Sequence, residues 1–446
     1  MKPLGYVARF RGGATPDTGK PEYWDGDIPW LSPKDMKRPV IEDSEDHVSA
    51  EALRNGPLSM IPPDAVLIVV RGMILAHTFP VALTGGPVTI NQDMKALVVA
   101  QVLQPRFLFW ALRGFANALV ALADESAHGT RKLETFTLSR FPILLPPSRE
   151  QRAIADFLDR ETAKLDTLVA KKRALIEKLK EKRTALISRT VTRGLPAEAA
   201  AKAGLDPLPK LKPSGIDWLG DVPEHWDVKP VKFVARVGNG STPSRGNTDF
   251  WLEGDYPWLN SSVVNLEEVT EPTELVTEAA LHQCHLPRIT PPAVLIGITG
   301  EGKTRGMATT LQIEATINQH LAFVKPRDAR CEVRYLRRVF DRAYQFLRNE
   351  SDGGGSTKGA MTCEQIASLR IPIPPYAEQR TIADYLDRET AKIDRMVAKV
   401  EEAIERLQEY RTALITAAVT GKIDVRGAVH DREASVPEPN KARVLA

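Results

Sequence analysis

Residues Gly297 to Gly306 read "GITGEGKTRG", which contains the pattern G-x-x-x-x-G-K-T. In a P-loop, backbone N–H groups of this pattern surround the phosphates of ATP or GTP, and the lysine reaches them. A P-loop must also open a helix whose N-terminus faces the phosphates. After Thr304 the chain reads "RGMATTLQIEATI", whose β-branched residues predict a second strand instead. We therefore interpret the stretch as a hairpin tip that carries Lys303 and Arg305 on a basic turn.

Two further patterns could carry chemistry, and both are incomplete. The stretch "HQCH" offers His282, Cys284 and His285 as metal ligands. A structural zinc site needs a second ligand pair at recognisable spacing, and none is evident, so we predict no metal. A DNA methyltransferase would carry an Asn/Asp-Pro-Pro-aromatic motif, but "IPPD" at Ile61 and "TPPA" at Thr290 lack the aromatic residue. We expect no catalytic residues in this chain.

The bulk composition fits a soluble protein of the cytoplasm. The chain has 446 residues, of which 43% are hydrophobic and 26% charged, so two to four globular domains are expected. Three cysteines, an odd number at scattered positions, suit a reducing compartment. No apolar run approaches the ~20 residues that span a bilayer, so no membrane partner is expected. The net charge of +3 permits a nucleic-acid partner if positive charge is concentrated locally.

An internal repeat organises the chain. "EQRAIADFLDRETAKLDTLVAKKRALIEKLKEKRTALISRTVT" begins at Glu150, and "EQRTIADYLDRETAKIDRMVAKVEEAIERLQEYRTALITAAVT" begins at Glu378. Fainter echoes keep the same register: "KPLGYVARFRGGATP" and "KPVKFVARVGNGSTP", "DAVLIVVRGM" and "PAVLIGITGE", "INQDMKALVV" and "INQHLAFVKP". The sequence therefore predicts a pseudo-twofold internal repeat, in which each half is a divergent globular part followed by a nearly invariant helix.

The repeat predicts six segments with distinct roles. They are globular head 1 (residues 1–148), helical spacer 1 (149–194), a Pro/Ala/Gly-rich linker and lead-in (195–226), globular head 2 (227–376), helical spacer 2 (377–422) and a disordered tail (423–446). The lead-in containing Trp218 and Trp226 precedes the second head only. Either the chain start is abbreviated, or the linker and tail substitute for it.

The two repeated segments read as long helices that pair with each other. Seven-residue spacing marks one apolar stripe on each, formed by Leu158, Leu165, Leu179 and Leu186, and by Leu386, Ile393, Val400, Leu407 and Leu414. A neighbouring stripe is expected at Ile154, Leu168 and Leu175 in the first copy, and at Ile382 and Met396 in the second. Sustained heptads without Pro or Gly predict an antiparallel coiled coil. At ~1.5 Å rise per residue each helix would be about 60 Å long.

These features together resemble the specificity subunit of type I restriction-modification enzymes. The resemblance rests on the paired "PP…EQRxIADxLDRETAKxD" helices, the "IDWLGDVPEHWDVKP" lead-in, "TP…W…PWL" early in each head and the G-S/T-T-K-like turn near each head's end. It covers nearly the whole chain. It implies two α/β (α+β) recognition domains separated by two long helices, with each domain reading one half of a bipartite, asymmetric DNA sequence.

The resemblance also implies partners. The helices would set the spacer between the half-sites and dock two methyltransferase subunits, and restriction/translocase subunits would join that core. This chain would be a non-catalytic subunit that binds double-stranded DNA and no cofactor of its own. S-adenosylmethionine and ATP with Mg²⁺ are expected in the partner subunits.

Candidate DNA-contacting residues are polar and basic side chains on loops and turns, because Arg and Lys bind phosphates or guanine, and Asn and Gln suit adenine. In the first head they are Thr15, Arg71, Asn91, Gln92, Thr130, Arg131 and Lys132, and in the second Ser241, Thr242, Arg245, Lys303, Arg305, Asn318, Gln319, Ser356, Thr357 and Lys358. Members that recur in both heads, such as the Asn-Gln pairs, could instead shape turns. Base-reading residues should differ between heads. Trp30 and Trp258 are expected in the core.

Two other functions stay open at this point. The first is a P-loop nucleotidase built on Gly297–Thr304, and the second is a coiled-coil scaffold without a DNA role. Binding of nucleotide that is lost on Lys303→Ala would favour the first. Absence of salt-dependent DNA affinity would favour the second.

Overall fold

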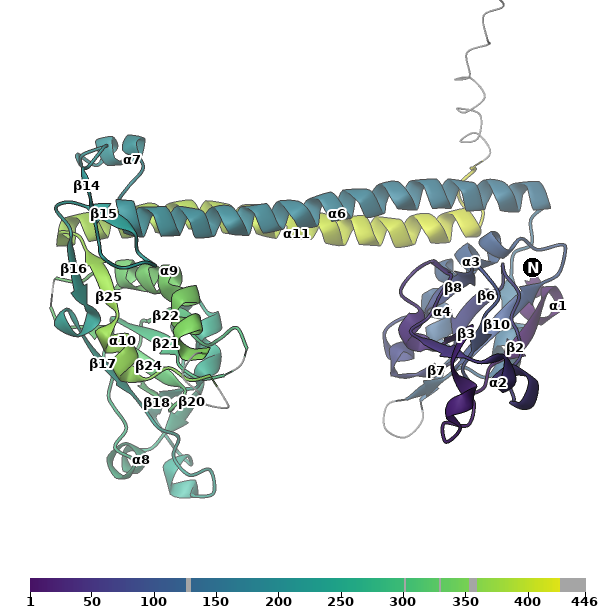
Figure 1. Ribbon diagram of the computed structural model, residues 1–446, viewed down its shortest axis with the longest axis horizontal. Coiled ribbons are helices and arrows are strands. Elements are labelled where there is room, and N and C mark those ends of the chain that lie inside the picture. The colour runs from purple at the N-terminus through teal and green to yellow at the C-terminus, as the bar shows by residue number, and fades with distance from the viewer. Residues whose placement is uncertain (126–129, 301, 329, 353–358, 426–446) are drawn as a thin grey trace, which may run out of the picture. The chain divides into compact units, whose positions relative to one another are not determined.

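The structure, a computed structural model, describes residues 1–125, 130–300, 302–328, 330–352 and 359–425. The chain forms two compact units, Met1–Arg173 with Glu401–Ala446, and Ala174–Val400. Each unit holds one globular head and part of both long helices (Figure 1). In the described part of the chain, no helix is both long and apolar enough to cross a membrane. Most of the predicted tail, from residue 426 onward, lies outside the described residues.

Both heads are built around a five-stranded sheet with the same strand order. In the first head the order is β2 (Ala8–Gly12), β10 (Met94–Val99), β6 (Val66–Val69), β8 (Val81–Thr84), β4 (Val40–Ile41). In the second it is β17 (Ala235–Asn239), β24 (Leu321–Pro326), β21 (Ala293–Gly297), β22 (Ala308–Leu311), β19 (Glu268–Val269). In each sheet only the last strand pair is parallel. The predicted repeat of α/β heads is confirmed.

Smaller sheets extend this framework in the same way in both heads. One has the order β5 (Asp46–Val48), β3 (Trp24–Leu31), β9 (Thr89–Ile90), matched by β20 (Glu274–Val276), β18 (Tyr256–Leu259), β23 (Thr316–Ile317). A two-stranded sheet joins β1 (Lys2–Pro3) to β13 (Pro142–Ile143), matched by β16 (Asp227–Pro230) and β25 (Arg370–Ile373). The first head adds β11 (Asp124–Glu125), β12 (Arg131–Lys132) and β7 (Arg71–Gly72).

Short helices complete the heads and the linker. They are α1 (Leu4–Val7), α2 (Ala50–Asn55), α3 (Pro105–Gly114), α4 (Ala116–Ala121) and α5 (Thr135–Arg140) in the first head, α7 (Ala197–Lys202) in the linker, and α8 (Glu278–Gln283), α9 (Val333–Asp352) and α10 (Cys363–Ser368) in the second head. Strands β14 (Leu211–Pro213) and β15 (Asp221–Pro223) pair between α7 and the second head.

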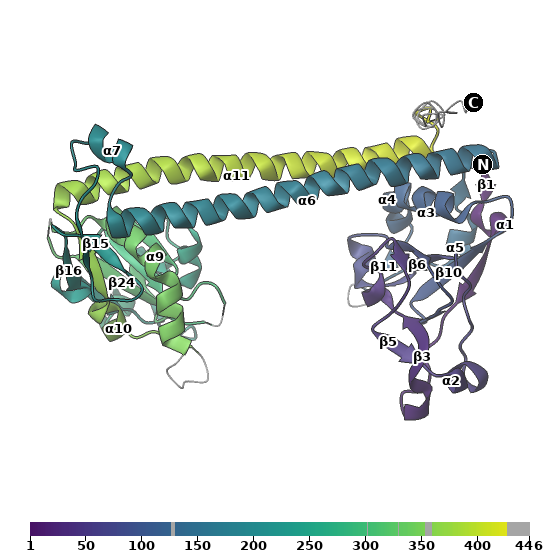
Figure 2. The same cartoon turned by 45° about the horizontal axis from the view of Figure 1, so that its top comes forward.

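The central strands are buried on both faces, as their unbroken apolar sequences require. Every residue of β6 and of β21 is buried. Helix α3 packs on β6 and β8, and α9 packs on β21 and β22. In each unit this helix lies between the sheet and the long helices (Figures 1 and 2). Helices α3 and α9 therefore form the side of each head that faces the long helices.

The two long helices are α6 (Ser148–Arg193) and α11 (Tyr376–Val419). Neither contains an internal Pro or Gly. Gly194 (φ 81°) follows α6, and Gly421 (φ 70°) lies just beyond α11. This left-handed conformation favours glycine and ends helices by satisfying their last carbonyl groups.

Within each unit the two helices run antiparallel. In the first unit Arg411 Nε donates to Asp166 Oδ1 at 3.1 Å, and in the second Arg183 Nε donates to Asp394 Oδ1 at 3.1 Å. Asp394 and Arg411 occupy the positions of the second repeat that correspond to Asp166 and Arg183 in the first. The same pair therefore occurs once in each unit with the helices exchanged, as expected when two copies of one sequence pair antiparallel. The predicted antiparallel coiled coil is confirmed.

The faces along which the two helices pair follow a 3.5-residue period, and one predicted stripe does not lie on these faces. Leu158, Leu386 and Ile393 are buried. The other residues of the expected main stripes are half-buried, namely Leu165, Leu179, Leu186, Val400, Leu407 and Leu414. The expected neighbouring stripe is wrong at Leu168 and Leu175, which are 41% and 45% exposed, and at Met396. The inward flank is formed by Thr162, Val169 and Ile176, and by Thr390, Val397 and Ile404. Together with the main stripes, these residues follow one another at alternating steps of four and three.

A buried glutamine near the start of each long helix fastens the head to it. In the second unit Gln379 accepts a hydrogen bond from the Glu332 N–H and donates to the carbonyls of Arg330 and Pro374, each at 2.8 Å. In the first unit Gln151 makes the same three contacts, to Gln104, Val102 and Pro146. Both glutamines are 0% exposed. The repeated "EQR" thus has a structural role, which is to hold the loop before α3 or α9.

An arginine of α3 or α9 adds an ion-paired contact to the same helix. Arg106 pairs with Asp156 and Asp159 of α6. Arg334 pairs with Asp384 and Asp387 of α11, with N–O distances of 2.8 and 3.1 Å. These aspartates are the "D" residues of "IADxLD" in both repeats.

The lead-in before the second head covers the start of α11. Trp226 is fully buried, and its Nε1 donates to Glu378 Oε1 at 3.1 Å. His225 Nε2 lies 2.9 Å from Glu378 Oε2. Trp218 is 8% exposed and packs in the same core.

We expect Gln379→Leu to destabilise the protein by about 2–4 kcal/mol, because it leaves one buried donor and two buried acceptors without partners. Urea unfolding followed by circular dichroism measures the change. Gln408→Leu is the matched control, since Gln408 is an exposed residue of the same helix. Equal unfolding midpoints for the two variants would contradict the assigned role.

Candidate nucleic-acid interface and its junction with the long helices

The P-loop-like stretch is the connection of a hairpin. Strands β21 and β22 pair antiparallel, with Ile296 opposite Ala308. Among the described residues after Thr304 no helix begins before α9. The hairpin interpretation is therefore confirmed. Lys303 is exposed, as a DNA contact requires. Arg305 is 2% exposed, so the expectation that it lies on the open face of the turn is wrong.

The residues that recur in both heads form a shared scaffold. Thr15 donates to Gln92, and Thr242 donates to Gln319 at 2.6 Å. Both glutamines are exposed, so this polar pair is accessible in each head.

The asparagines that precede these glutamines are buried. Asn91 Oδ1 accepts from the Asp93 N–H at 3.1 Å, and Asn318 Oδ1 accepts from the His320 N–H at 3.0 Å. Asn91 is 6% exposed and Asn318 5%. These side chains stabilise turns, as the sequence left open, and the DNA contacts expected of Asn91 and Asn318 stay predictions.

A tryptophan anchors the same region of each head to its core. Trp30 is 8% exposed and Trp258 2%, as expected for core residues. Trp30 Nε1 donates to the Ala14 carbonyl at 3.0 Å, and Trp258 Nε1 donates to the Ser241 carbonyl at 3.2 Å. These bonds fix the loops that carry Thr15 and Thr242. Gly240 lies so close to Ile317 that an added Cβ would be 1.7 Å from the Ile317 carbonyl oxygen.

The first head gathers three of its predicted basic residues on one small sheet. Lys132 lies opposite Arg71 in the β12–β7 pair, and Arg131 is next to Lys132. Arg71 is exposed, whereas Thr130, Arg131 and Lys132 are half-exposed. Lys132 Nζ lies 2.5 Å from Glu134 Oε1. The hydrogen bond and charge of Lys132, with the charge of Arg71, lower the pKa of Glu134.

The second head carries different residues at the equivalent place. Thr299 there bridges to Ala360, where the first head has Arg71 and Lys132. Its exposed Arg245 instead lies over the Trp251 ring, at 3.9 Å from the centroid, and pairs with Glu274. Ser241 and Thr242 are half-buried nearby. Ser356, Thr357 and Lys358 lie outside the described residues. The two heads therefore share a framework and differ in the polar groups that they expose.

The side chains of the "HQCH" stretch do not form a set of metal ligands among the described residues. His282 lies at the end of α8 with its side chain 82% exposed, and Cys284 is half-buried. No group of three or more His, Cys, Asp or Glu side chains suitable for a metal ion occurs in the described ranges.

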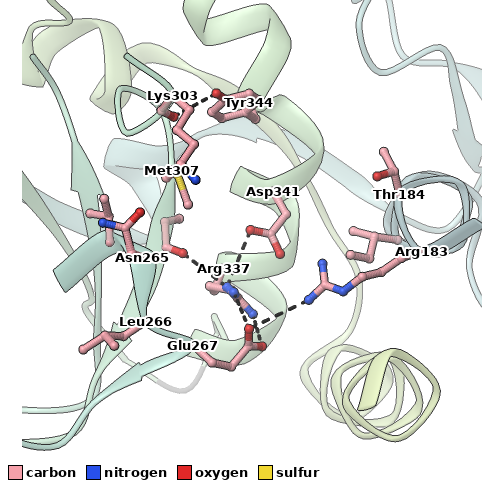
Figure 3. A pocket seen from close by; sticks show the side chains of 14 residues that line it. Arg183, Thr184, Asn265, Leu266, Glu267, Lys303, Met307, Arg337, Asp341 and Tyr344 are labelled. Carbon is pink, nitrogen blue, oxygen red and sulfur yellow. Dashed lines mark hydrogen bonds and ion pairs between the residues drawn. The ribbon is translucent and has the colours of Figure 1, made fainter. Parts of the chain in front are cut away.

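A charged network at the junction between the second head and the long helices was not expected from the sequence. Glu267, just before β19, accepts from Arg337 Nη2 and Arg338 Nη2, both at 2.9 Å. Arg183 of α6 approaches Glu267 to 3.8 Å. These residues border a cavity of about 420 Å³ between α6, α9 and the β21–β22 hairpin, which Lys303 and Tyr344 also line (Figure 3).

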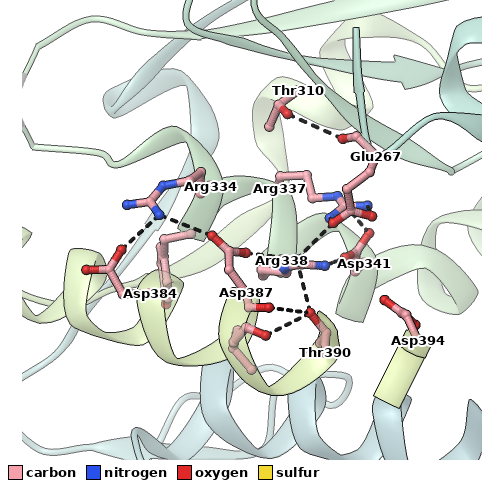
Figure 4. A network of polar contacts seen from close by, with 12 residues as sticks. Glu267, Thr310, Arg334, Arg337, Arg338, Asp341, Asp384, Asp387, Thr390 and Asp394 are labelled. Atoms are coloured by element: carbon pink, nitrogen blue, oxygen red, sulfur yellow. Dashed lines mark hydrogen bonds and ion pairs between the residues drawn. The ribbon is translucent and has the colours of Figure 1, made fainter. Parts of the chain in front are cut away.

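Arg338 carries this network on to α11. Its side chain is 3% exposed, and its Nη2 donates to Asp387 Oδ1 at 2.9 Å (Figure 4). Asp341 lies 3.3 Å from Arg338 Nη1. Burial raises the pKa of Asp341, although the charges of Arg337, Arg338 and Arg183 act in the opposite direction. The repeat gave no signal for this network, because Glu267, Arg337 and Arg338 correspond to Pro39, Phe109 and Trp110 in the first half.

Comparison with known proteins finds a family model that matches this chain. The model described as "Type I restriction modification DNA specificity domain" matches residues 1–178 and 223–406, more than half of the chain. The EcoR124I/EcoR124II specificity subunit of Escherichia coli is 34% identical over 168 residues, which cover 37% of this chain and 41% of that protein. The MjaIX specificity subunit of Methanocaldococcus jannaschii is 24% identical over 328 residues, covering 73% of this chain and 71% of that protein.

The fold has a solved counterpart. A structure solved in work on complex assembly and conformational transition of the type I R-M system matches with a TM-score of 0.63 and 17% identity. The match covers 94% of this chain and 96% of that one.

The charged junction predicts a pH-dependent stability. Burial would raise the pKa of Glu267, but the hydrogen bond and charge of Arg337, with the charges of Arg338 and Arg183, lower it from 4.5 to about 2. Because the folded-state pKa is depressed, the stabilisation is complete above about pH 4.5 and is lost as the pH falls toward 2. Glu267 is partly exposed, so we expect Glu267→Gln to cost about 1–2 kcal/mol at pH 7. Urea unfolding at pH 7 and at pH 3 should show this difference shrinking, and a difference that stays constant would contradict the assignment.

Proposed function

Because this chain belongs to the type I restriction-modification DNA specificity family, we propose that it is the DNA-recognition subunit of such a complex, in which each head reads one half of a bipartite site. The observation that carries the proposal is the duplicated scaffold with divergent surfaces. Both heads keep the Thr–Gln pair and the buried Trp. They differ where Arg71 and Lys132 are replaced by Thr299 and Ala360.

The chemistry of DNA suggests different roles for the residues that the two heads share and for those that differ. Residues that recur in both heads can hold loops or bind the phosphate backbone, which is the same for every sequence. Residues that differ can contact base edges, where the donor and acceptor pattern changes with sequence. We assign base reading in the first head to the region of Arg71, Arg131 and Lys132, and in the second head to the region of Arg245 and Lys303.

The long helices would set the distance between the two half-sites. Each head is fastened to a long helix by a buried glutamine and by Arg–Asp pairs. The helices would also dock two methyltransferase subunits, and restriction/translocase subunits would join them. S-adenosylmethionine and ATP with Mg²⁺ would be bound by those partners, and this chain would act in the cytoplasm as a non-catalytic subunit.

The nucleotidase alternative lacks its structural requirement. The G-x-x-x-x-G-K-T stretch connects two antiparallel strands and does not open a helix. A phosphate-binding loop without the helix N-terminus loses most of its converging N–H groups. A scaffold without a DNA role would give no reason for the heads to expose different basic side chains.

The decisive experiment is methylome sequencing of the host with and without this gene. We expect methylation at one bipartite, asymmetric motif to disappear with the gene. Complementation with Arg71→Ala/Lys132→Ala should relax or abolish recognition of one half-site only. A methylome without change at any bipartite motif would refute the proposed function.

The spacing role predicts an effect of helix length. Seven residues inserted into α6 between Leu165 and Leu186, with seven at the equivalent place in α11, preserve the heptad period and add ~10 Å. We expect the recognised spacer to lengthen by about 3 base pairs, at ~3.4 Å each, with both half-sites unchanged. Changed half-sites with the original spacer would contradict this role, and methylome sequencing measures both.

A further inference from the structure

The junction between the first head and the long helices contains a basic cavity. It has a volume of about 400 Å³ and lies entirely in the first unit. Its polar walls include Arg38, Thr78, Arg113, Asn117 and Arg411, with no Asp or Glu in its lining.

This cavity is the counterpart of the cavity beside Glu267 in the second unit. Both long-helix arginines have an aspartate partner, Asp166 for Arg411 and Asp394 for Arg183. Strands β4 and β19 make equivalent parallel pairs with β8 and β22. This register places Pro39 where the second unit has Glu267.

The helices α3 and α9 confirm the correspondence. Arg106 and Arg334 make the same contacts with the long helices. Counting forward from them, Arg113 stands where the second unit has Asp341. The second unit therefore lines its cavity with two carboxylates, and the first unit has a proline and an arginine in their places.

The replacement leaves positive charge concentrated in the first unit. Arg113 is half-buried and lies over the rings of Phe109 and Trp110, at 5.1 and 5.4 Å from their centroids. No ion pair of Arg113 occurs among the described residues. Burial, and then the charge of Arg411, lower the pKa of Arg113 to about 10, with Asp166 opposing. The guanidinium is still charged at neutral pH, so an anion in the cavity would relieve both costs.

We propose that this cavity binds a phosphate group, held by Arg113 and Arg411. The first unit has Phe109 and Trp110 where Arg337 and Arg338 hold Glu267, so the cationic side chains that line its cavity come from Lys37, Arg38, Arg113 and Arg411. Planar guanidinium groups suit the paired oxygens of phosphate. The side chains of Thr78 and Asn117 line the cavity with additional hydrogen-bond donors.

The phosphate has two possible sources, the DNA backbone and a free phosphate ion. The DNA backbone is one source because the cavity lies close in sequence to a base-reading candidate. Ile74, which lines the cavity, is three residues after the exposed Arg71. Only this choice of source rests on the proposed function. The cavity itself is assigned from its charge and its counterpart.

The test is thermal unfolding of the full chain in sodium phosphate and in sodium chloride of equal ionic strength. We expect phosphate to raise the Tm of the wild-type protein by about 2–4 °C more than chloride. Arg113→Leu should abolish this difference. Pro39→Glu, which restores a carboxylate as in the second unit, should abolish it without lowering the Tm in chloride. Arg395→Leu, which removes an exposed arginine of α11 outside the cavity, should keep it.

Three results would overturn the proposal. They are a wild-type protein insensitive to phosphate, an equal shift in Arg113→Leu, and a shift with sodium acetate but none with phosphate, which would indicate a carboxylate ligand.

Fluorescence anisotropy with DNA carrying the recognised site identifies the source. Weaker binding by Arg113→Leu, with a salt slope smaller by about one, assigns the phosphate to the DNA backbone. Unchanged DNA binding together with the lost thermal shift assigns it to free phosphate. The thermal unfolding experiment needs no DNA, so its result tests the phosphate site even if the proposed function is wrong.

Discussion

The antiparallel pairing of two helices that are copies of one sequence is the constraint on which the rest of the structure depends. When two copies pair about a two-fold relation, each contact must occur twice with the partners exchanged. Asp166 with Arg411 and Arg183 with Asp394 meet this requirement at the same N–O distance of 3.1 Å. Such pairs are exposed and contribute little energy, so their value is in fixing register. The near-identity of the two helices follows from this geometry, whereas the heads are free to diverge.

The attachment of each head to its helix explains which residues of the heads stay alike. Gln151 and Gln379 each satisfy one buried N–H and two buried carbonyls of the loop that leads into α3 or α9. Buried backbone groups without partners are costly, so the two glutamines stabilise the attachment of each head to its helix. Elsewhere in each head, Trp30 and Trp258 hold the equivalent loops that carry Thr15 and Thr242. The shared contacts thus run from the helix to the base of each loop, and divergence between the heads is concentrated in what the loops expose.

Much of this architecture could be predicted from the sequence because its signals are local or repeated. The heptads gave the helices and their pairing, and the β-branched residues after Thr304 gave the hairpin. What could not be predicted depends on long-range packing. The pattern around Arg305 indicates a turn but not that its side chain is 2% exposed. Leu168 lies one position before Val169, which belongs to the paired face. Only the alternating steps of four and three residues distinguish these two positions. The network of Glu267 with Arg337 and Arg338 joins segments about 70 residues apart (separations of 70 and 71).

The two junctions show how a repeat can keep its geometry while changing its chemistry. In the second unit Arg183, Arg337 and Arg338 find their carboxylate partners within the chain, namely Glu267, Asp341, Asp387 and Asp394. In the first unit Phe109 and Trp110 replace two of those arginines, and Arg113 replaces the aspartate. An apolar surface in place of ion pairs is energetically acceptable in a core, but it does not explain an added arginine beside Arg411. Arg113 keeps its charge against both burial and Arg411, with Asp166 as the opposing carboxylate, and the phosphate proposed for this cavity would relieve that cost, which distinguishes the first junction from the second.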